Sequence, residues 1–118
     1  MSPSRDWRLY VQDMIAACDV IAEYARGFSK EHFVADRRTK DAVVRNLISL
    51  GEAAARVPEE ARALAPDVPW RRIVRFRNIA VHGYFFLDDD IVWSVVETEL
   101  PRLRQSVMTL LDLPATEA

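Results

Sequence analysis

Four side chains that can handle a phosphate group and a proton lie within eight consecutive residues of this chain. They are Arg77, Asn78, His82 and Tyr84. Histidine side chains exchange protons near neutral pH, and arginine makes forked contacts to phosphate. The chain has only one other histidine, His32, so candidates for proton transfer near neutral pH are few. The grouping points to phosphodiester chemistry that needs no metal.

These residues fall at the end of a predicted helix that begins at Pro69-Trp70 and stops at Gly83. At about 100° per residue, one narrow stripe of this helix holds four polar side chains. They are Arg71, Arg75, Asn78 and His82. The residues expected broadly opposite the stripe are apolar: Ile73, Val74, Ala80 and Val81. The polar stripe can therefore line a groove.

Arg77 projects away from His82 on an ideal helical wheel, towards the apolar side. Its long side chain leaves two roles open. Arg77 either cooperates with His82 or orients Asn78 and the neighbouring backbone. His82 lies at the helix C-terminus, where the negative end of the helix dipole stabilises an imidazolium and suits a general acid or base. A histidine that only caps the helix is the structural alternative.

Three further long helices are predicted from apolar positions spaced by three and four residues. The first starts at Pro3 or Ser4 and stops at Gly27. The second is capped by Thr39 and ends at Pro58. The fourth is capped by Asp88 or Asp89 and runs to Leu111, with Pro101 expected to bend or split it. Short helical segments are expected at 29–32 and 59–64, with a connection at 36–38.

No strand-like alternation stands out along the sequence. The predicted fold class is all-α, an up-and-down antiparallel bundle of four main helices plus short helical segments. At 118 residues, the chain is expected to be a single domain, 1–118, with residues 114–118 as a frayed tail.

The charge of the chain is nearly balanced, with a formal net charge of −2. The whole molecule is therefore no strong attractor of nucleic acid. Of its sixteen basic residues only Lys30 and Lys40 are lysines. The arginines at 71, 72, 75 and 77 either form a local basic site or reflect an arginine-rich composition.

Cys18 is the only cysteine, so no intrachain disulfide is possible, and its apolar surroundings predict a core position.

No apolar run approaches the roughly 18 residues of a membrane span, and no signal peptide is evident at the N-terminus. A cytoplasmic location without membrane contact is expected. No array of metal ligands appears at the usual spacing, so neither a metal nor a cofactor is expected.

His32 is expected to be structural or solvated, and Asp88-Asp89-Asp90 to cap a helix. Arg45 and Asn46 are candidates to approach the cleft from the second helix. The small residues around Gly51 and Glu52 predict a close helix contact or a dimer face.

The sequence resembles the HEPN-domain proteins of the HepT type over roughly residues 5 to 112. Arg77, Asn78, His82 and Tyr84 match the family's Arg-Asn-x-x-x-His-x-Tyr motif. The ordered segments that share the resemblance are Asp41 to Leu47 with Gly51-Glu52-Ala53, Pro69-Trp70 to Ile73, and Tyr84-Phe85 to Trp93. The motif alone is weak, but the ordered set is specific.

This resemblance implies the toxin of a toxin–antitoxin system, a metal-independent ribonuclease that acts on RNA, with tRNA and mRNA both open as targets. It makes Arg77 and His82 catalytic, with Asn78 and Arg75 supporting, and implies a homodimer that brings two motifs to one cleft. It further implies that an MntA-type nucleotidyltransferase antitoxin adenylylates Tyr84. The alternative is a non-catalytic HEPN module that binds nucleotide, RNA or a nucleotidyltransferase. A purely structural helical adaptor is the third possibility.

Overall fold

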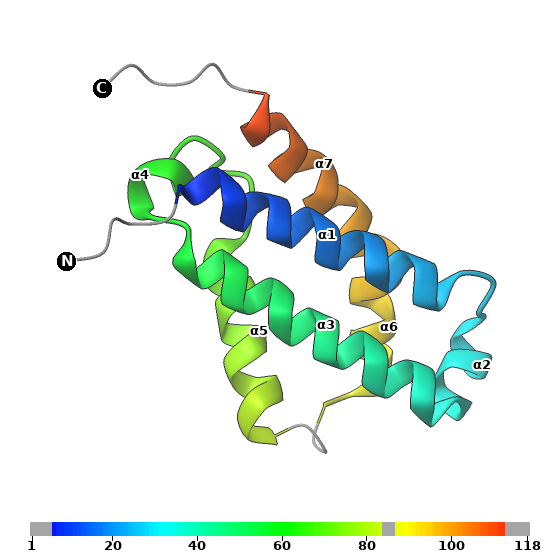
Figure 1. Ribbon diagram of the computed structural model, residues 1–118. Coiled ribbons are helices and arrows are strands. Elements are labelled where there is room, and N and C mark those ends of the chain that lie inside the picture. The colour runs from blue at the N-terminus through cyan, green and yellow to red at the C-terminus, as the bar shows by residue number, and fades with distance from the viewer. Residues whose placement is uncertain (1–5, 84–86, 113–118) are drawn as a thin grey trace.

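The structure, a computed structural model, describes residues 6–83 and 87–112, and these residues form helices only (Figure 1). In chain order the elements are α1 (Trp7–Ala25), α2 (Lys30–Ala35), α3 (Arg37–Arg56), α4 (Glu59–Arg62), α5 (Trp70–Gly83), α6 (Asp89–Ser94), the π-helical turn η2 (Val95–Glu99) and α7 (Leu100–Leu111). The predicted all-α class is confirmed. The expected tail at 114–118 lies outside the described residues.

The helices follow one another across the molecule in the order α7, α1, α3 and α5 (Figure 1). Helix α3 therefore lies between α1 and α5, and α1 lies between α3 and α7. The short helices α2 and α6 meet at one end of this arrangement. Helix α5 packs mainly against α3, which leaves much of its surface free.

The core is built from side chains spaced by three and four residues on the long helices. Its members include Val11, Met14, Cys18 and Ile21 of α1, Val43, Leu47, Leu50 and Ala54 of α3, and Leu103, Val107 and Leu110 of α7. Burial raises the pKa of the Cys18 thiol to about 12, because the apolar surroundings penalise the charged thiolate. Among the described residues, no helix is long and apolar enough to cross a membrane.

Two helix starts differ from the sequence prediction. Helix α1 is capped by Asp6, whose carboxylate accepts the Arg8 N–H at 2.9 Å, and not by Pro3 or Ser4. Helix α3 is capped by Asp36, whose carboxylate accepts the Thr39 N–H at 3.0 Å, so Thr39 is not the cap. Aspartate is a strong N-cap because its side chain replaces a missing backbone acceptor. Asp36 also ends α2, so the expected connection at 36–38 shrinks to this residue.

The acidic run at 88–90 begins α6 as predicted. The Asp88 carboxylate accepts the Asp90 N–H at 2.8 Å and so caps the helix. The carboxylates of Asp89 and Asp90 also form ion pairs, which were not predicted from the sequence. Lys30 Nζ lies 2.8 Å from Asp90 Oδ1, and Lys40 Nζ lies 3.1 Å from Asp89 Oδ1. The start of α6 is thereby tied to α2 and α3.

Pro101 neither ends nor sharply splits the last helix. The chain remains helical from Asp89 to Leu111, but the five residues of η2 before the proline adopt π-helical turns. Proline has no N–H to donate to a carbonyl one turn earlier. A wider turn directly before it lets the helix continue past this missing bond.

Candidate active site

The polar stripe of α5, formed by Arg71, Arg75, Asn78 and His82, is exposed at all four positions. On the opposite side, Ala80 is buried and Ile73 is partly buried against the core. The predicted stripe is therefore present. Not every apolar side chain of α5 is buried, since 51% of Val81 is exposed.

The side chain of Arg77 packs against α3 at Gly51. A Cβ atom added to Gly51 would lie 2.9 Å from Arg77 Cγ, closer still to Arg77 Cβ, and 3.2 Å from the Ile73 carbonyl oxygen. Only a residue without a side chain allows α5 to approach α3 this closely. Of the two roles predicted for the small residues around Gly51, the close helix contact is the one observed. Gly51 itself is buried within the chain and offers no dimer face.

The guanidinium group of Arg77 lies against Asn78 of the polar stripe. Its Nη1 donates a hydrogen bond to Asn78 Oδ1, with the two atoms 2.6 Å apart. Its Nε is buried and has no hydrogen-bond partner among the described residues. The guanidinium is thus held between a buried stem and a neighbouring carboxamide. This arrangement joins Arg77 to Asn78, in agreement with the orienting role considered from the sequence, and leaves donors available for an anion.

His82 occupies the last turn of α5 and is exposed. Within the described part of the chain, no hydrogen bond or ion pair engages its imidazole. A free imidazole at a helix C-terminus can accept a proton from a bound substrate or donate one to it. Tyr84, two residues further along, lies outside the described residues.

The remaining candidates take no part in this grouping. Arg45 is exposed, and the Asn46 amide donates to the Ala42 carbonyl of its own helix at 2.9 Å. His32 is exposed and stacks on Phe28 with ring centroids 4.4 Å apart, as expected for a structural or solvated histidine. Among residues 6–83 and 87–112, no three His, Cys, Asp or Glu side chains gather in a way that could hold a metal ion.

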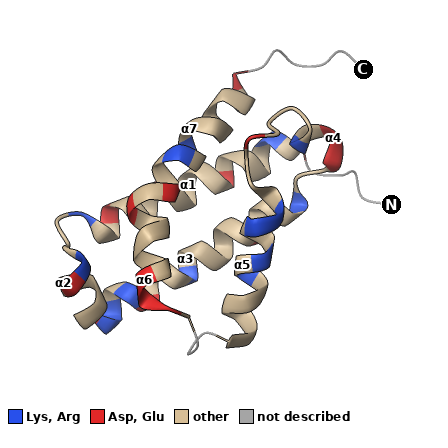
Figure 2. Ribbon diagram, turned by 180° about the vertical axis from the view of Figure 1, so that it is seen from behind, with Lys and Arg blue, Asp and Glu red and all other residues tan. Residues whose placement is uncertain are grey.

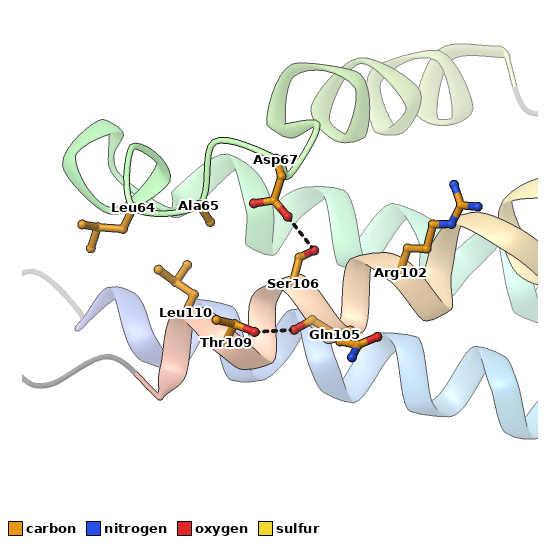
Figure 3. A pocket seen from close by; sticks show the side chains of 8 residues that line it. All are labelled: Leu64, Ala65, Asp67, Arg102, Gln105, Ser106, Thr109 and Leu110. Carbon is orange, nitrogen blue, oxygen red and sulfur yellow. Dashed lines mark hydrogen bonds between the residues drawn. The ribbon is translucent and has the colours of Figure 1, made fainter.

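Hollows on the described surface include three that border α5 or α7. One of about 410 Å³ lies between the segment after α4 and α7, where the Ser106 hydroxyl donates to Asp67 at 3.0 Å (Figure 3). It contains no residue of the polar stripe. A groove of about 370 Å³ separates α5 from α6, η2 and α7, with an apolar floor that includes Leu50 and Phe76. The third hollow, also about 410 Å³, lies at the start of α5 and is lined by arginines.

Sequence reasoning missed two features of this region. The seat that Gly51 provides for Arg77 had one signal, a lone glycine inside a strong helical pattern, which often marks a close approach. The arginine-lined hollow depends on Arg62, which reaches back to the end of α3. No local pattern in the sequence indicates that contact.

One helix of this all-α fold thus presents an arginine, a carboxamide and a histidine near its C-terminal end. The profile of a family described as "Ribonuclease HepT-like" matches residues 14–110. The chain belongs to this HepT-like ribonuclease family.

Several curated proteins are similar to it. A "Probable ribonuclease HepT" of Thermococcus cleftensis is 34% identical over 100 residues, which cover 85% of this chain and 91% of that protein. A "Putative RNase" of Caldanaerobacter subterraneus subsp. tengcongensis is 34% identical over 104 residues, covering 88% and 93%. Another "Putative RNase", of Methanocaldococcus jannaschii, is 28% identical over 103 residues, covering 87% and 94%. No solved structure matches the chain significantly.

Proposed function

We propose that this chain is a metal-independent endoribonuclease, the toxin of a toxin–antitoxin system, with Arg77 and His82 as catalytic residues and Asn78 and Arg75 in support. One observation carries the proposal beyond family membership. The Arg77 guanidinium is held against Asn78, on the edge of a polar stripe that ends at His82. A cation that can bind phosphate and a side chain that can transfer protons thus occupy one helix end.

The reaction would be an attack by the ribose 2′-hydroxyl oxygen on the neighbouring phosphorus. The bond from phosphorus to the 5′ oxygen breaks, which leaves a 2′,3′-cyclic phosphate and a free 5′-hydroxyl. A base takes the proton from the 2′-hydroxyl, and an acid gives a proton to the departing 5′ oxygen. His82 serves in one of these roles, and Arg77 stabilises the negative charge that grows on the phosphoryl oxygens.

One histidine per chain cannot easily fill both roles at once, so the proposal includes a symmetric homodimer. Support comes from the apolar side chains around the stripe. Ile79 and Val81 on α5 are 48% and 51% exposed. Exposed apolar side chains on one helix can form part of an interaction surface. The outer face of α5, rather than the surroundings of Gly51, is therefore the surface proposed to meet the second copy.

Regulation by an MntA-type nucleotidyltransferase is part of the same proposal. Two peptide units separate His82 from Tyr84, which keeps their Cα atoms within about 8 Å in any conformation. An O-AMP group on the tyrosine would bring a negative charge next to the residues that are proposed to bind RNA phosphate. Adenylylation of Tyr84 would then compete with RNA.

Incubation of the purified protein with total cellular RNA in EDTA tests the enzyme. We expect cleavage by the wild type, loss of cleavage in His82→Ala, and unchanged cleavage in His32→Ala. The last variant is a matched control, because it removes the chain's other exposed histidine from α2. Binding of RNA without any cleavage would favour the non-catalytic HEPN module. No binding and no effect of either substitution would favour a structural adaptor.

A further inference from the structure

The first turn of α5 borders a hollow that is rich in positive charge. The hollow, of about 410 Å³, lies between α4 and α5 and is lined by Arg62, Arg71 and Arg72, with Glu59 as its one acidic residue. Arg62 is fixed in the wall of the hollow. Its Nε donates to the Val57 carbonyl at 2.9 Å. The lining thus carries three arginines against one acidic residue, so the hollow has a positive charge balance.

The basic side chains of α5 are only partly balanced by acidic ones. Arg72 lies 3.7 Å from Glu99, an exposed and therefore weak ion pair. Arg71 and Arg75 are exposed, and no carboxylate pairs with either of them in the described part of the chain. Helix α5 itself contains no acidic residue. Figure 2 shows this basic half of α5, while the acidic residues gather on other elements.

Arg71 and Arg75 lie on the same polar stripe of α5 as His82. The hollow borders the first turn of this helix, whereas His82 lies in its last turn. His82 lies eleven positions after Arg71, which corresponds to about 16 Å along a helix axis. A nucleic-acid strand advances by about 3.4 Å per stacked nucleotide, so roughly five nucleotides span this distance. The cations therefore lie along a line that one strand of RNA can follow.

We infer that Arg71 and Arg75, together with the hollow at the start of α5, form a phosphate track for RNA. The track holds phosphates several nucleotides to one side of the bond that lies at His82. This inference rests on the proposed function and adds a second binding site to it. It follows that the substrate must extend for several nucleotides on one side of the cleaved bond, and that a dinucleotide is a poor substrate.

The track is tested by the salt dependence of RNA binding. The probe is a fluorescein-labelled RNA of about ten nucleotides, twice the length of the track. Its 2′-O-methyl groups block cleavage. Binding to wild type and to Arg71→Gln/Arg75→Gln is followed by fluorescence anisotropy over a range of KCl concentrations. Each phosphate contact with a single strand contributes about 0.7 to the slope of log K against log salt, so the double variant should lose about 1.4.

The matched control is Arg26→Gln/Arg38→Gln. It removes the same charge from two exposed arginines outside α5, and its slope should equal that of the wild type. Equal slopes in both double variants, or no binding by the wild type at about 50 mM salt, would overturn the track. Displacement of the probe by a glutamate-rich peptide as readily as by unlabelled RNA would overturn its assignment to RNA. Circular dichroism confirms that each variant is folded.

Cleavage of unmodified RNA is measured separately and distinguishes the two proposals. Cleavage that depends on His82, combined with an unchanged slope in Arg71→Gln/Arg75→Gln, would refute the track and leave the enzyme. A reduced slope without any cleavage would refute the enzyme and leave the track.

Discussion

Gly51→Ala adds one methyl group where α3 meets the stem of Arg77. The new Cβ would lie 2.9 Å from Arg77 Cγ, whereas ordinary contacts begin at 3.4 Å, so the two atoms must move apart. The separation needed at Arg77 Cβ is larger. Because that atom is bonded directly to the backbone of α5, rotation of a flexible side chain cannot relieve the clash, and the helix itself must move.

Two opposing effects set the size of the change in stability. Overpacking of a close contact costs about 1–3 kcal/mol. Alanine favours a helix over glycine by about 1 kcal/mol. Since the clash involves a helix rather than a flexible side chain, we expect an overpacking cost in the upper part of its range. After the gain in helix propensity, the free energy of unfolding should fall by about 2 kcal/mol. With a urea m-value of about 1–3 kcal/mol/M, the unfolding midpoint should fall by about 1 M. Ser49→Ala, an exposed change on α3, is the control and should not lower it.

A double-mutant cycle tests the cause. Arg77→Gly removes the Cβ that the added methyl group would strike, whereas Arg77→Ala keeps it. Combined with Gly51→Ala, Arg77→Gly should therefore show a favourable coupling of about 1 kcal/mol or more, and Arg77→Ala a clearly smaller one. Equal couplings in the two cycles, or a Gly51→Ala protein as stable as the wild type, would refute the reasoning. If the proposed function holds, RNA cleavage by Gly51→Ala should fall by about ten- to a hundred-fold, because small misplacements of catalytic groups are costly.

Three further predictions concern modification, assembly and chemical reactivity. Tyr84→Phe should cleave RNA but escape neutralisation by a cognate nucleotidyltransferase with ATP, while Tyr24→Phe, which changes an exposed tyrosine of α1, should still be neutralised. Mass spectrometry that finds AMP on a residue other than Tyr84 would contradict this assignment. Val81→Arg should weaken the proposed dimer about tenfold or more, because it places a charge in an apolar interface. Val34→Arg, a similar change on α2, should leave the mass measured by light scattering unchanged, and a wild type that is monomeric at micromolar concentration would argue against the dimer. Cys18 should resist iodoacetamide at about pH 8.5 in the folded protein but react in guanidinium, because burial raises its pKa to about 12 and keeps the thiol neutral. Rapid alkylation of the folded protein, measured by mass spectrometry, would show that the thiol is accessible.

The features predicted well from the sequence are those set by local periodicity. The stripe from Arg71 to His82 follows from the helical repeat alone, and so does the core position of Cys18. Helix starts were less certain because several residues near each end can serve as a cap. Asp36 and Thr39 are both good N-cap residues, and the fold uses the one that also ends α2.

Features that depend on two distant segments could not be derived in this way. The packing of Arg77 against α3 depends on Gly51, which lies on another helix. The exposure of Val81 likewise depends on which elements pack beside α5 and not on the pattern of α5 itself. Tertiary packing decides each of these cases.

The position of α5 at the edge of the molecule has a consequence for how the protein unfolds. The helix packs mainly on α3, whereas α1 and α3 are surrounded by other elements. Segments with few buried contacts open at a lower free energy than the rest of a fold. Amide hydrogens of α5 should therefore exchange with deuterium faster than those of α1 and α3. The whole proposed site could then detach while the core remains intact, and a second copy or a bound RNA would stabilise α5 through mass action.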